Sequence, residues 1–206
     1  MELTCDATAL IPPNTLDRVP CTIRNNTNGV ITALVLGESV SIENNGKSSI
    51  ESGYIAIDTF VHPDFHKKSE SKGLKREART NFPFASVTYD GIITRLQVHI
   101  DYVEFADKQI LGPNRQGSEM VGGIRDGAAK YKDWLVREFQ SKGRSADILV
   151  SLLREDQPLP VDLVMSSGSQ EQGAAIYRNQ LRKIHRTEGV EQLLKQWNSR
   201  ISTGNR

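Results

Sequence analysis

The sequence predicts an α+β protein: an antiparallel β-sandwich over residues 1–112, immunoglobulin-like by its number of strands, followed by a helical region over residues 113–206. Two observations lead to this prediction. Short β-prone runs separated by turn residues occupy the first half, which is typical of a sandwich. After Gly112-Pro113 the apolar residues instead recur every three or four positions, which indicates helices. The Cys-Trp-Cys pattern of immunoglobulin domains is missing, because both tryptophans lie in the second half.

Composition limits the classes of protein to which the chain can belong. With 37% hydrophobic and 25% charged residues, it can build a core and is rather polar. Its net charge of +1 predicts no global attraction to nucleic acid or to an anionic membrane. No apolar run approaches the ~20 residues of a membrane-spanning helix, and the start of the chain lacks the pattern of a signal peptide. We therefore expect a cytosolic protein or an extracytoplasmic mature domain, with a lean toward the second.

Turn residues divide the first half into strands. The predicted strands cover 21–24, 30–36, 39–43, 54–61, 85–89 and 92–105. The pairs Asn28-Gly29, Asn45-Gly46 and Asp90-Gly91 separate such runs and predict three hairpin turns, because both residues of each pair tolerate positive φ. Within 92–105 the apolar face changes parity near Tyr102-Val103, which predicts a bulge or a change of sheet.

Three helices are predicted in the second half. The first begins near the N-cap Ser118 and ends at Gly143. The second covers 146–155 after Ser145, although 148–150 is also compatible with a strand. The third covers 171 to about 199, with an interruption at Gly189.

Glycines and tryptophans of this half are interpreted as packing residues. Gly122, Gly123 and Gly127 lie within the first helix and lack the GxxxxGK[ST] spacing of a phosphate loop, so we expect them to allow close approach of a neighbouring helix. Trp134 and Trp197 are expected to anchor helices in a core or an interface.

The two cysteines, Cys5 and Cys21, allow two interpretations. No CxxC pattern is present, which argues against a zinc ribbon or a thioredoxin-like site. A disulfide between them would stabilise the fold by about 3 kcal/mol through loop closure. If reduced, both are expected to be small core residues.

The most distinctive compositional feature is a basic segment between His66 and Arg79. It holds six basic and two acidic residues, so its net charge is +6 − 2 = +4. Such a segment can contact an acidic protein or phosphates, although no aromatic residues alternate with the charges to stack on bases. The basic side of the last helix is a second candidate contact surface. The candidate binding residues are Lys67, Lys68, Lys72, Lys75, Arg76, Arg79, Arg178, Arg182, Lys183 and Arg186.

Two weaker patterns suggest enzyme chemistry. His62, Asp64 and His66 alternate and could share one face of a strand as metal ligands, but Pro63 indicates a turn, and the interpretation as an exposed strand end is favoured. His99 and Asp101 could form a general-base pair on one strand face, but we interpret them as the polar outer side of a half-buried strand.

The sequence therefore favours a non-enzymatic binding or structural module that recognises an acidic surface through the basic segment. A metal-dependent hydrolase using His62, Asp64 and His66 is the alternative. No cofactor is expected. The partner and the oligomeric state are left open.

Overall fold

The structure of the chain is a computed structural model that describes residues 1–5, 15–16, 20–61, 73–83, 87–154 and 158–202. Two compact units follow one another along the chain, Met1–Val121 and Gly122–Arg206. The first contains the sheets and the second contains helices, so the protein is α+β with a helical C-terminal region. None of the helices described is long and apolar enough to cross a membrane.

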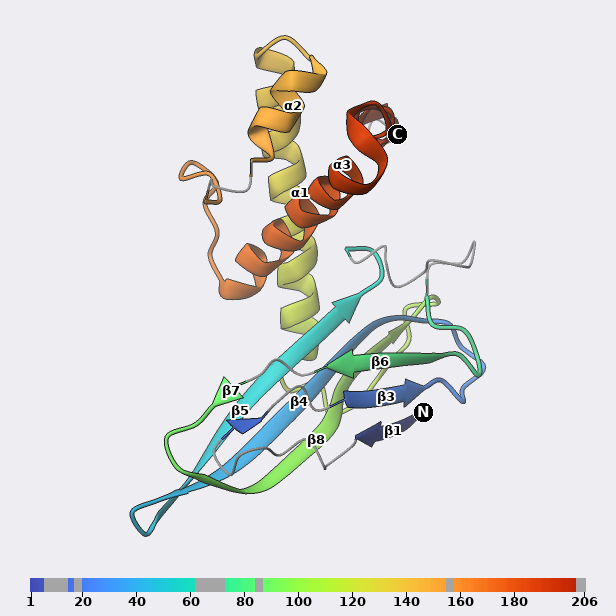
Figure 1. Cartoon of the computed structure of the whole chain (residues 1–206). Helices are drawn as coiled ribbons and strands as arrows, with labels where there is room; N and C mark the ends of the chain where they lie inside the picture. Colours follow the sequence, from blue (N-terminus) through green and yellow to red (C-terminus); the bar gives the residue numbers. More distant parts are fainter. Residues whose placement is uncertain (6–14, 17–19, 62–72, 84–86, 155–157, 203–206) are drawn as a thin grey trace. The chain divides into compact units, whose positions relative to one another are not determined.

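The first unit is built from antiparallel strands. Its strands are β1 (Glu2–Cys5), β2 (Thr15–Leu16), β3 (Pro20–Arg24), β4 (Ile31–Asn44), β5 (Lys47–Asp58), β6 (Arg79–Pro83), β7 (Val87–Thr88), β8 (Ile92–Phe105) and β9 (Ile110–Leu111). The largest sheet has the order β5-β4-β8-β9, a second sheet has the order β1-β3-β6, and β2 pairs with β7. Figure 1 shows the long strands β4, β5 and β8 side by side, with β3 and β6 in front of them.

Alternation along the strands forms the core of this unit. On β4, Leu34, Leu36, Val40 and Ile42 share one face, and each is at most 3% exposed. They belong to one hydrophobic cluster with Cys21 and Ile23 of β3 and with Val103 and Phe105 of β8. Burial of each such large apolar side chain contributes about 1.5–3 kcal/mol.

Only one of the three predicted hairpins forms. Asn45 (φ 51°) and Gly46 (φ 73°) join β4 to β5 in the left-handed turn conformation that such hairpins need. The prediction at Asn28-Gly29 was wrong, because β3 and β4 lie in different sheets. The prediction at Asp90-Gly91 was also wrong, because β7 pairs with β2 whereas β8 pairs with β4. The turn residues were identified, but the strands beside them pair with partners far away in the sequence.

The predicted bulge in β8 is confirmed at Asp101. Val35 of β4 lies opposite Tyr102, and the next residue, Leu36, lies opposite Ile100, so that Asp101 is left unpaired. The extra residue keeps Ile100 and Val103 on the same side of the sheet, against the core, although their sequence parity differs.

The helices are α1 (Gly117–Ser141), α2 (Ala146–Leu152) and α3 (Gly168–Ser202). Trp134 and Trp197, 8% and 0% exposed, belong to the hydrophobic cluster of the second unit, which confirms them as core anchors. The Ser145 hydroxyl accepts a hydrogen bond from the Ile148 N–H and caps α2 as predicted. Gly189 (φ 85°, ψ 174°) interrupts α3 as predicted, with backbone angles that essentially only glycine adopts.

Close packing through Gly123 and Gly127 is also confirmed. A Cβ atom on Gly127 would lie 1.9 Å from the carbonyl oxygen of Gln170, and one on Gly123 would lie 2.0 Å from the Ser169 hydroxyl. From the other helix, a Cβ on Gly173 would lie 2.0 Å from the Ile124 carbonyl oxygen. At Gly127 and Gly173 the backbones of α1 and α3 therefore approach so closely that only glycine fits, whereas at Gly123 the neighbour is the side chain of Ser169. Gly122 takes no part, since nothing lies within 4 Å of its Cβ position.

Cys5 and Cys21 form a disulfide in the structure. The two residues lie directly opposite each other on β1 and β3. Cys21 is fully buried in the core of the first unit, so the bond attaches β1 to that core.

Candidate functional site

Part of the predicted basic segment lies within the described residues. Lys75, Arg76 and Arg79 are all exposed. Lys67, Lys68 and Lys72 lie outside the described residues, as do His62, Asp64 and His66 of the alternative metal site.

A buried asparagine fixes the described part of this segment. Asn25 is 0% exposed, and its side-chain N–H groups donate to the carbonyl oxygens of Gly29 and Leu74, each at 2.8 Å. Its side-chain oxygen accepts hydrogen bonds from the N–H and hydroxyl groups of Thr27. Its main chain exchanges hydrogen bonds with Glu77 and Ala78. Every hydrogen-bonding position of Asn25 is thus used, and it ties residues 74–78 to the end of β3.

This attachment brings a further arginine to the segment. Arg24, the last residue of β3, lies opposite Arg79 of β6, and its guanidinium group donates two hydrogen bonds to one carboxylate oxygen of Glu77. Arg76 donates to the side-chain oxygen of Asn28 at 3.0 Å and lies 3.9 Å from Glu77. We call the four cations Arg24, Lys75, Arg76 and Arg79 the basic surface.

Glu77 lies among the arginines of the basic surface. The hydrogen bond from Arg24 and then its charge lower the pKa of Glu77, and the charges of Arg76 and Arg79 lower it further. With Glu2, which lies 4.0 Å from Arg24, the group holds four cations and two anions, so its net charge is +4 − 2 = +2. The side chains of Arg24 and Arg76 remain 40% and 64% exposed, so their remaining N–H groups are accessible to an anionic group in solution.

The second predicted contact surface, on α3, needs a correction. Arg182 is only 9% exposed, and its guanidinium group donates to the carbonyl oxygens of Leu153 and Arg154, just after α2. It therefore satisfies carbonyl groups at the end of that helix and is not an exposed contact. The prediction treated every basic residue of the helix as solvated, but an arginine can bury its stem and use its planar group as a cap. Arg178, Lys183 and Arg186 also interact with other groups of the chain.

His99 and Asp101 are not arranged as a catalytic pair. Asp101 is 0% exposed, and its carboxylate accepts hydrogen bonds from the main-chain N–H groups of Arg115 (2.9 Å) and Gln116 (3.0 Å). Burial raises the pKa of Asp101, but the hydrogen bonds from Gln116, Arg115 and Gly117, together with the charge of His99, outweigh this effect and the net shift is downward. The carboxylate caps the N-terminus of α1, so the interpretation as a solvated outer side was wrong for Asp101.

His99 lies in a row across the sheet with Gly37 and Tyr54. A Cβ on Gly37 would lie 2.5 Å from the His99 ring, and the rings of His99 and Tyr54 are 6.5 Å apart in an edge-on arrangement. The His99 Nε2 atom is buried and has no hydrogen-bond partner in the described part of the chain. The ring thus covers the glycine.

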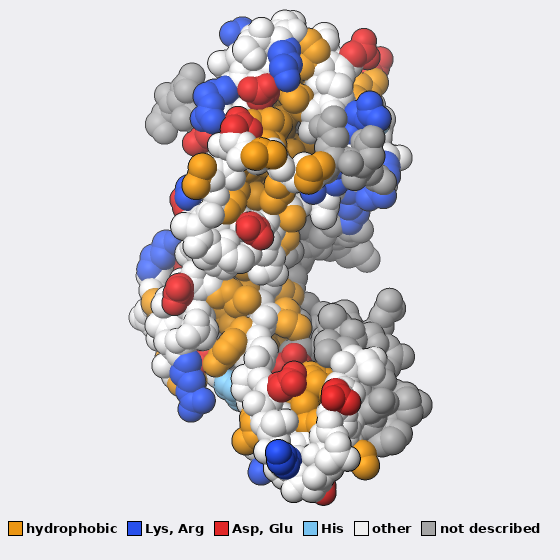
Figure 2. All heavy atoms as spheres, turned by 90° about the vertical axis from the view of Figure 1, so that its left-hand side faces the viewer, with side chains coloured by type: hydrophobic (Ala, Val, Ile, Leu, Met, Phe, Trp, Pro, Cys, Tyr) orange, Lys and Arg blue, Asp and Glu red, His pale blue; other side chains and the backbone are white. Residues whose placement is uncertain are grey.

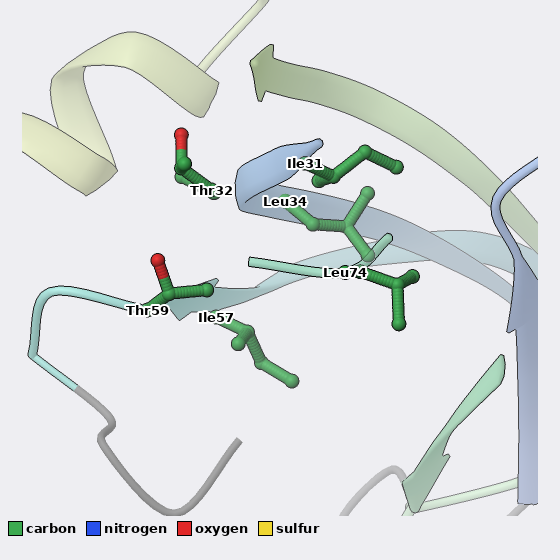
Figure 3. A pocket seen from close by; sticks show the side chains of 7 residues that line it. Ile31, Thr32, Leu34, Ile57, Thr59 and Leu74 are labelled. Atoms are coloured by element: carbon green, nitrogen blue, oxygen red, sulfur yellow. The ribbon is translucent and has the colours of Figure 1, made fainter. Parts of the chain in front are cut away.

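A small pocket opens at the ends of β4 and β5. Its cavity volume is about 10 Å³, room for about one water molecule, and it is lined by Ile31, Thr32, Ala33, Leu34, Ile57, Thr59 and Leu74. Figure 3 shows the hydroxyl oxygens of Thr32 and Thr59 on one side and the aliphatic side chains of Leu34, Ile57 and Leu74 on the other. The described lining contains no ionisable side chain.

Sequence reasoning missed Arg24 and Asn25. No local pattern relates residue 24 to residue 79, because their proximity comes from the pairing of β3 with β6. The only signal was that a run of turn residues, Asn25 to Gly29, directly follows a strand that ends in arginine.

No group of three or more His, Cys, Asp or Glu side chains that could hold a metal ion occurs in the described ranges. No known protein family, curated protein or solved structure matches the chain.

Proposed function

We propose that this protein is a non-enzymatic binding module that recognises an acidic protein surface through the basic surface of Arg24, Lys75, Arg76 and Arg79. The observation that carries the proposal is the attachment of these exposed cations to a fully hydrogen-bonded, buried Asn25. Cations held on a fixed backbone lose less conformational entropy on binding than cations on a free loop.

An acidic protein fits this surface better than a nucleic acid does. No aromatic residue lies between residues 73 and 79, so the segment lacks a platform on which a base could stack. Planar guanidinium groups bind carboxylates through more than one N–H group, and Arg24, which donates two hydrogen bonds to one oxygen of Glu77, is an example within the chain. We propose that a carboxylate of the partner takes a similar place beside Arg76 or Arg79.

The proposal extends to the arrangement of the two larger sheets, whose strands β3 and β6 carry part of the basic surface. We propose that the two larger sheets form an immunoglobulin-like β-sandwich, which is supported by the shared core cluster of Cys21, Ile23, Leu36 and Val103. Loops at the ends of such a frame are suited to recognition. The disulfide between Cys5 and Cys21 supports an oxidising, extracytoplasmic location, because such bonds persist there.

Binding of poly-L-glutamate, followed by fluorescence anisotropy at several salt concentrations, tests this proposal. Double charge reversal by Lys75→Glu and Arg76→Glu is expected to weaken binding about tenfold or more, and the affinity of the native chain should fall as salt rises. The matched control reverses one exposed lysine and one exposed arginine elsewhere, Lys195→Glu and Arg137→Glu. It changes the net charge equally and should bind nearly as well as the native chain.

An equal loss in both double variants would show that only net charge matters, and an unchanged affinity in the first would exclude the basic surface. A third variant with Lys67→Glu, Lys68→Glu and Lys72→Glu measures the contribution of the preceding part of the segment. We expect its effect to add to that of the first variant, since both parts would contact the same partner.

A further inference from the structure

The outer side of β5 is an exposed strand edge. β5 is the terminal strand of the largest sheet and pairs with β4 from Lys47 to Asp58. Residues 47–52 are exposed on both faces of the sheet, and Ile50 is 73% exposed. In Figure 2 this end of the hairpin faces the viewer at the bottom of the picture, mainly as white surface, the colour of backbone and small polar side chains.

The hairpin turn determines which backbone groups face outward. Asn44 and Lys47 flank the two-residue turn and form the first hydrogen-bonded pair. Because hydrogen-bonded and non-hydrogen-bonded pairs alternate in an antiparallel ladder, the N–H and C=O groups of Ser48, Ile50 and Ser52 point away from β4. Within the described part of the chain, no strand pairs with this side of β5.

This edge carries neither a proline nor a bulge, two of the devices that protect an edge strand from pairing with another strand. β5 contains no proline and pairs with β4 without a register shift, whereas the pairing of β8 with β4 has three. A regular edge with an exposed isoleucine is a template for strand addition.

We propose that β5 pairs antiparallel with β5 of a second copy of this chain, with Ile50 opposite Ile50 of the second copy. Ser48 then lies opposite Ser52 of the second copy, and Lys47 opposite Gly53. Three features favour this register. It uses the exposed part of the strand, it buries both copies of Ile50 against each other, and it places Lys47 diagonal to Glu51 of the second copy.

Neighbouring registers fit less well. Centring the pair on Glu51 would place two carboxylates directly opposite each other, which is unfavourable. Shifting the pair toward the end of β5 would require Ala56 and Asp58, which are 3% and 0% exposed, to accept a strand. The contact is small, so we expect the dimer to dissociate on dilution. The pairing uses none of the basic surface, so its failure leaves the proposed function intact.

Sedimentation of the full chain from micromolar to millimolar concentrations tests the pairing, and we expect a monomer–dimer equilibrium. Ser52→Pro removes an N–H that faces away from β4 and should weaken the dimer about tenfold or more without disturbing the hairpin. Ile50→Lys places two like charges directly opposite each other in the strand pair and should weaken the dimer by a similar amount. The control Ile92→Lys changes another exposed isoleucine, 57% exposed on β8, and should dimerise like the native chain.

Oxidation of Ile50→Cys identifies the register. Residues of a hydrogen-bonded pair have Cα atoms about 5.5 Å apart, within the range of a disulfide, so the variant should form a covalent dimer, whereas Ile92→Cys should not. A native chain that is monomeric at every concentration overturns the proposal. A dimer that both Ile50→Lys and Ser52→Pro leave unchanged also overturns it.

Discussion

Two glycines on the same helix should respond to alanine with opposite signs. At the exposed Gly122, nothing lies within 4 Å of the Cβ position, so Gly122→Ala gains the helix propensity of alanine, about 1 kcal/mol. Gly127→Ala gains the same amount but places a methyl group 1.9 Å from the Gln170 carbonyl oxygen and 2.6 Å from its Cα.

The steric term at Gly127 decides the sign there. The obstacle is backbone, which cannot rotate away, so α1 and α3 must separate. Overpacking of a core costs about 1–3 kcal/mol, and a backbone obstacle argues for the upper end. The propensity terms of the two variants cancel in their difference, so Gly127→Ala should be about 3 kcal/mol less stable than Gly122→Ala.

Urea unfolding followed by tryptophan fluorescence measures this difference. The chain contains only two tryptophans, Trp134 and Trp197, and both are buried in the helical unit, so the signal reports on that unit. The urea midpoints of the two variants are compared only if the free energy of unfolding falls with urea concentration at the same slope. A changed slope would indicate a change in the unfolded or native state. If Gly127→Ala proved as stable as Gly122→Ala, the close crossing of α1 and α3 at Gln170 would be refuted.

Two further predictions concern the first unit. Asp101→Asn should lower the free energy of unfolding by about 2 kcal/mol near neutral pH, because the amide replaces an acceptor with a donor that faces the N–H groups of Arg115 and Gln116. The pKa of Asp101 is lowered in the folded state. Its carboxylate therefore contributes fully to the free energy of unfolding above its ordinary pKa, and this contribution is lost as the pH falls through the lowered pKa. The stability difference between native chain and variant, measured by urea unfolding, should therefore shrink from about pH 7 to about pH 3, and a constant difference would contradict the capping role. Reduction of the bond between Cys5 and Cys21 should lower the free energy of unfolding by about 3 kcal/mol, measured by circular dichroism with and without reductant, with Cys5→Ser as control; an effect near zero would show that β1 is held by pairing alone.

Elements governed by nearby residues were predictable from the sequence. The cap at Ser145, the interruption at Gly189 and the close-packing glycines all depend on contacts or conformations that leave a local trace. The start of α1 was not predicted correctly. The prediction chose Ser118 as the cap, whereas the caps are the side chain of Asn114, which accepts from the Ser118 N–H, and Asp101 from β8. A cap supplied by another element cannot be identified from the sequence around the helix.

Strand pairing and the basic surface depend on long-range contacts and were only partly predictable. Asn28-Gly29 and Asp90-Gly91 have the composition of hairpin turns, but Gly91 instead packs against β4, where a Cβ would lie 2.7 Å from the Glu43 carbonyl oxygen. The charge of the segment ending at Arg79 was visible in composition. Its link to Arg24 was not, because it depends on the register between β3 and β6.

The bulge at Asp101 makes the number of residues in β8 as important as their chemistry. Substitution of Asp101 removes a cap and leaves the alternation of the strand intact. Deletion of the same residue would remove the cap and also shift the frame of the strand, so that the side chains before and after it could no longer both face the core. A substitution and a deletion at this position therefore disturb the structure in different ways. Homologous chains with the same fold should tolerate insertions and deletions in the turns more readily than at this position.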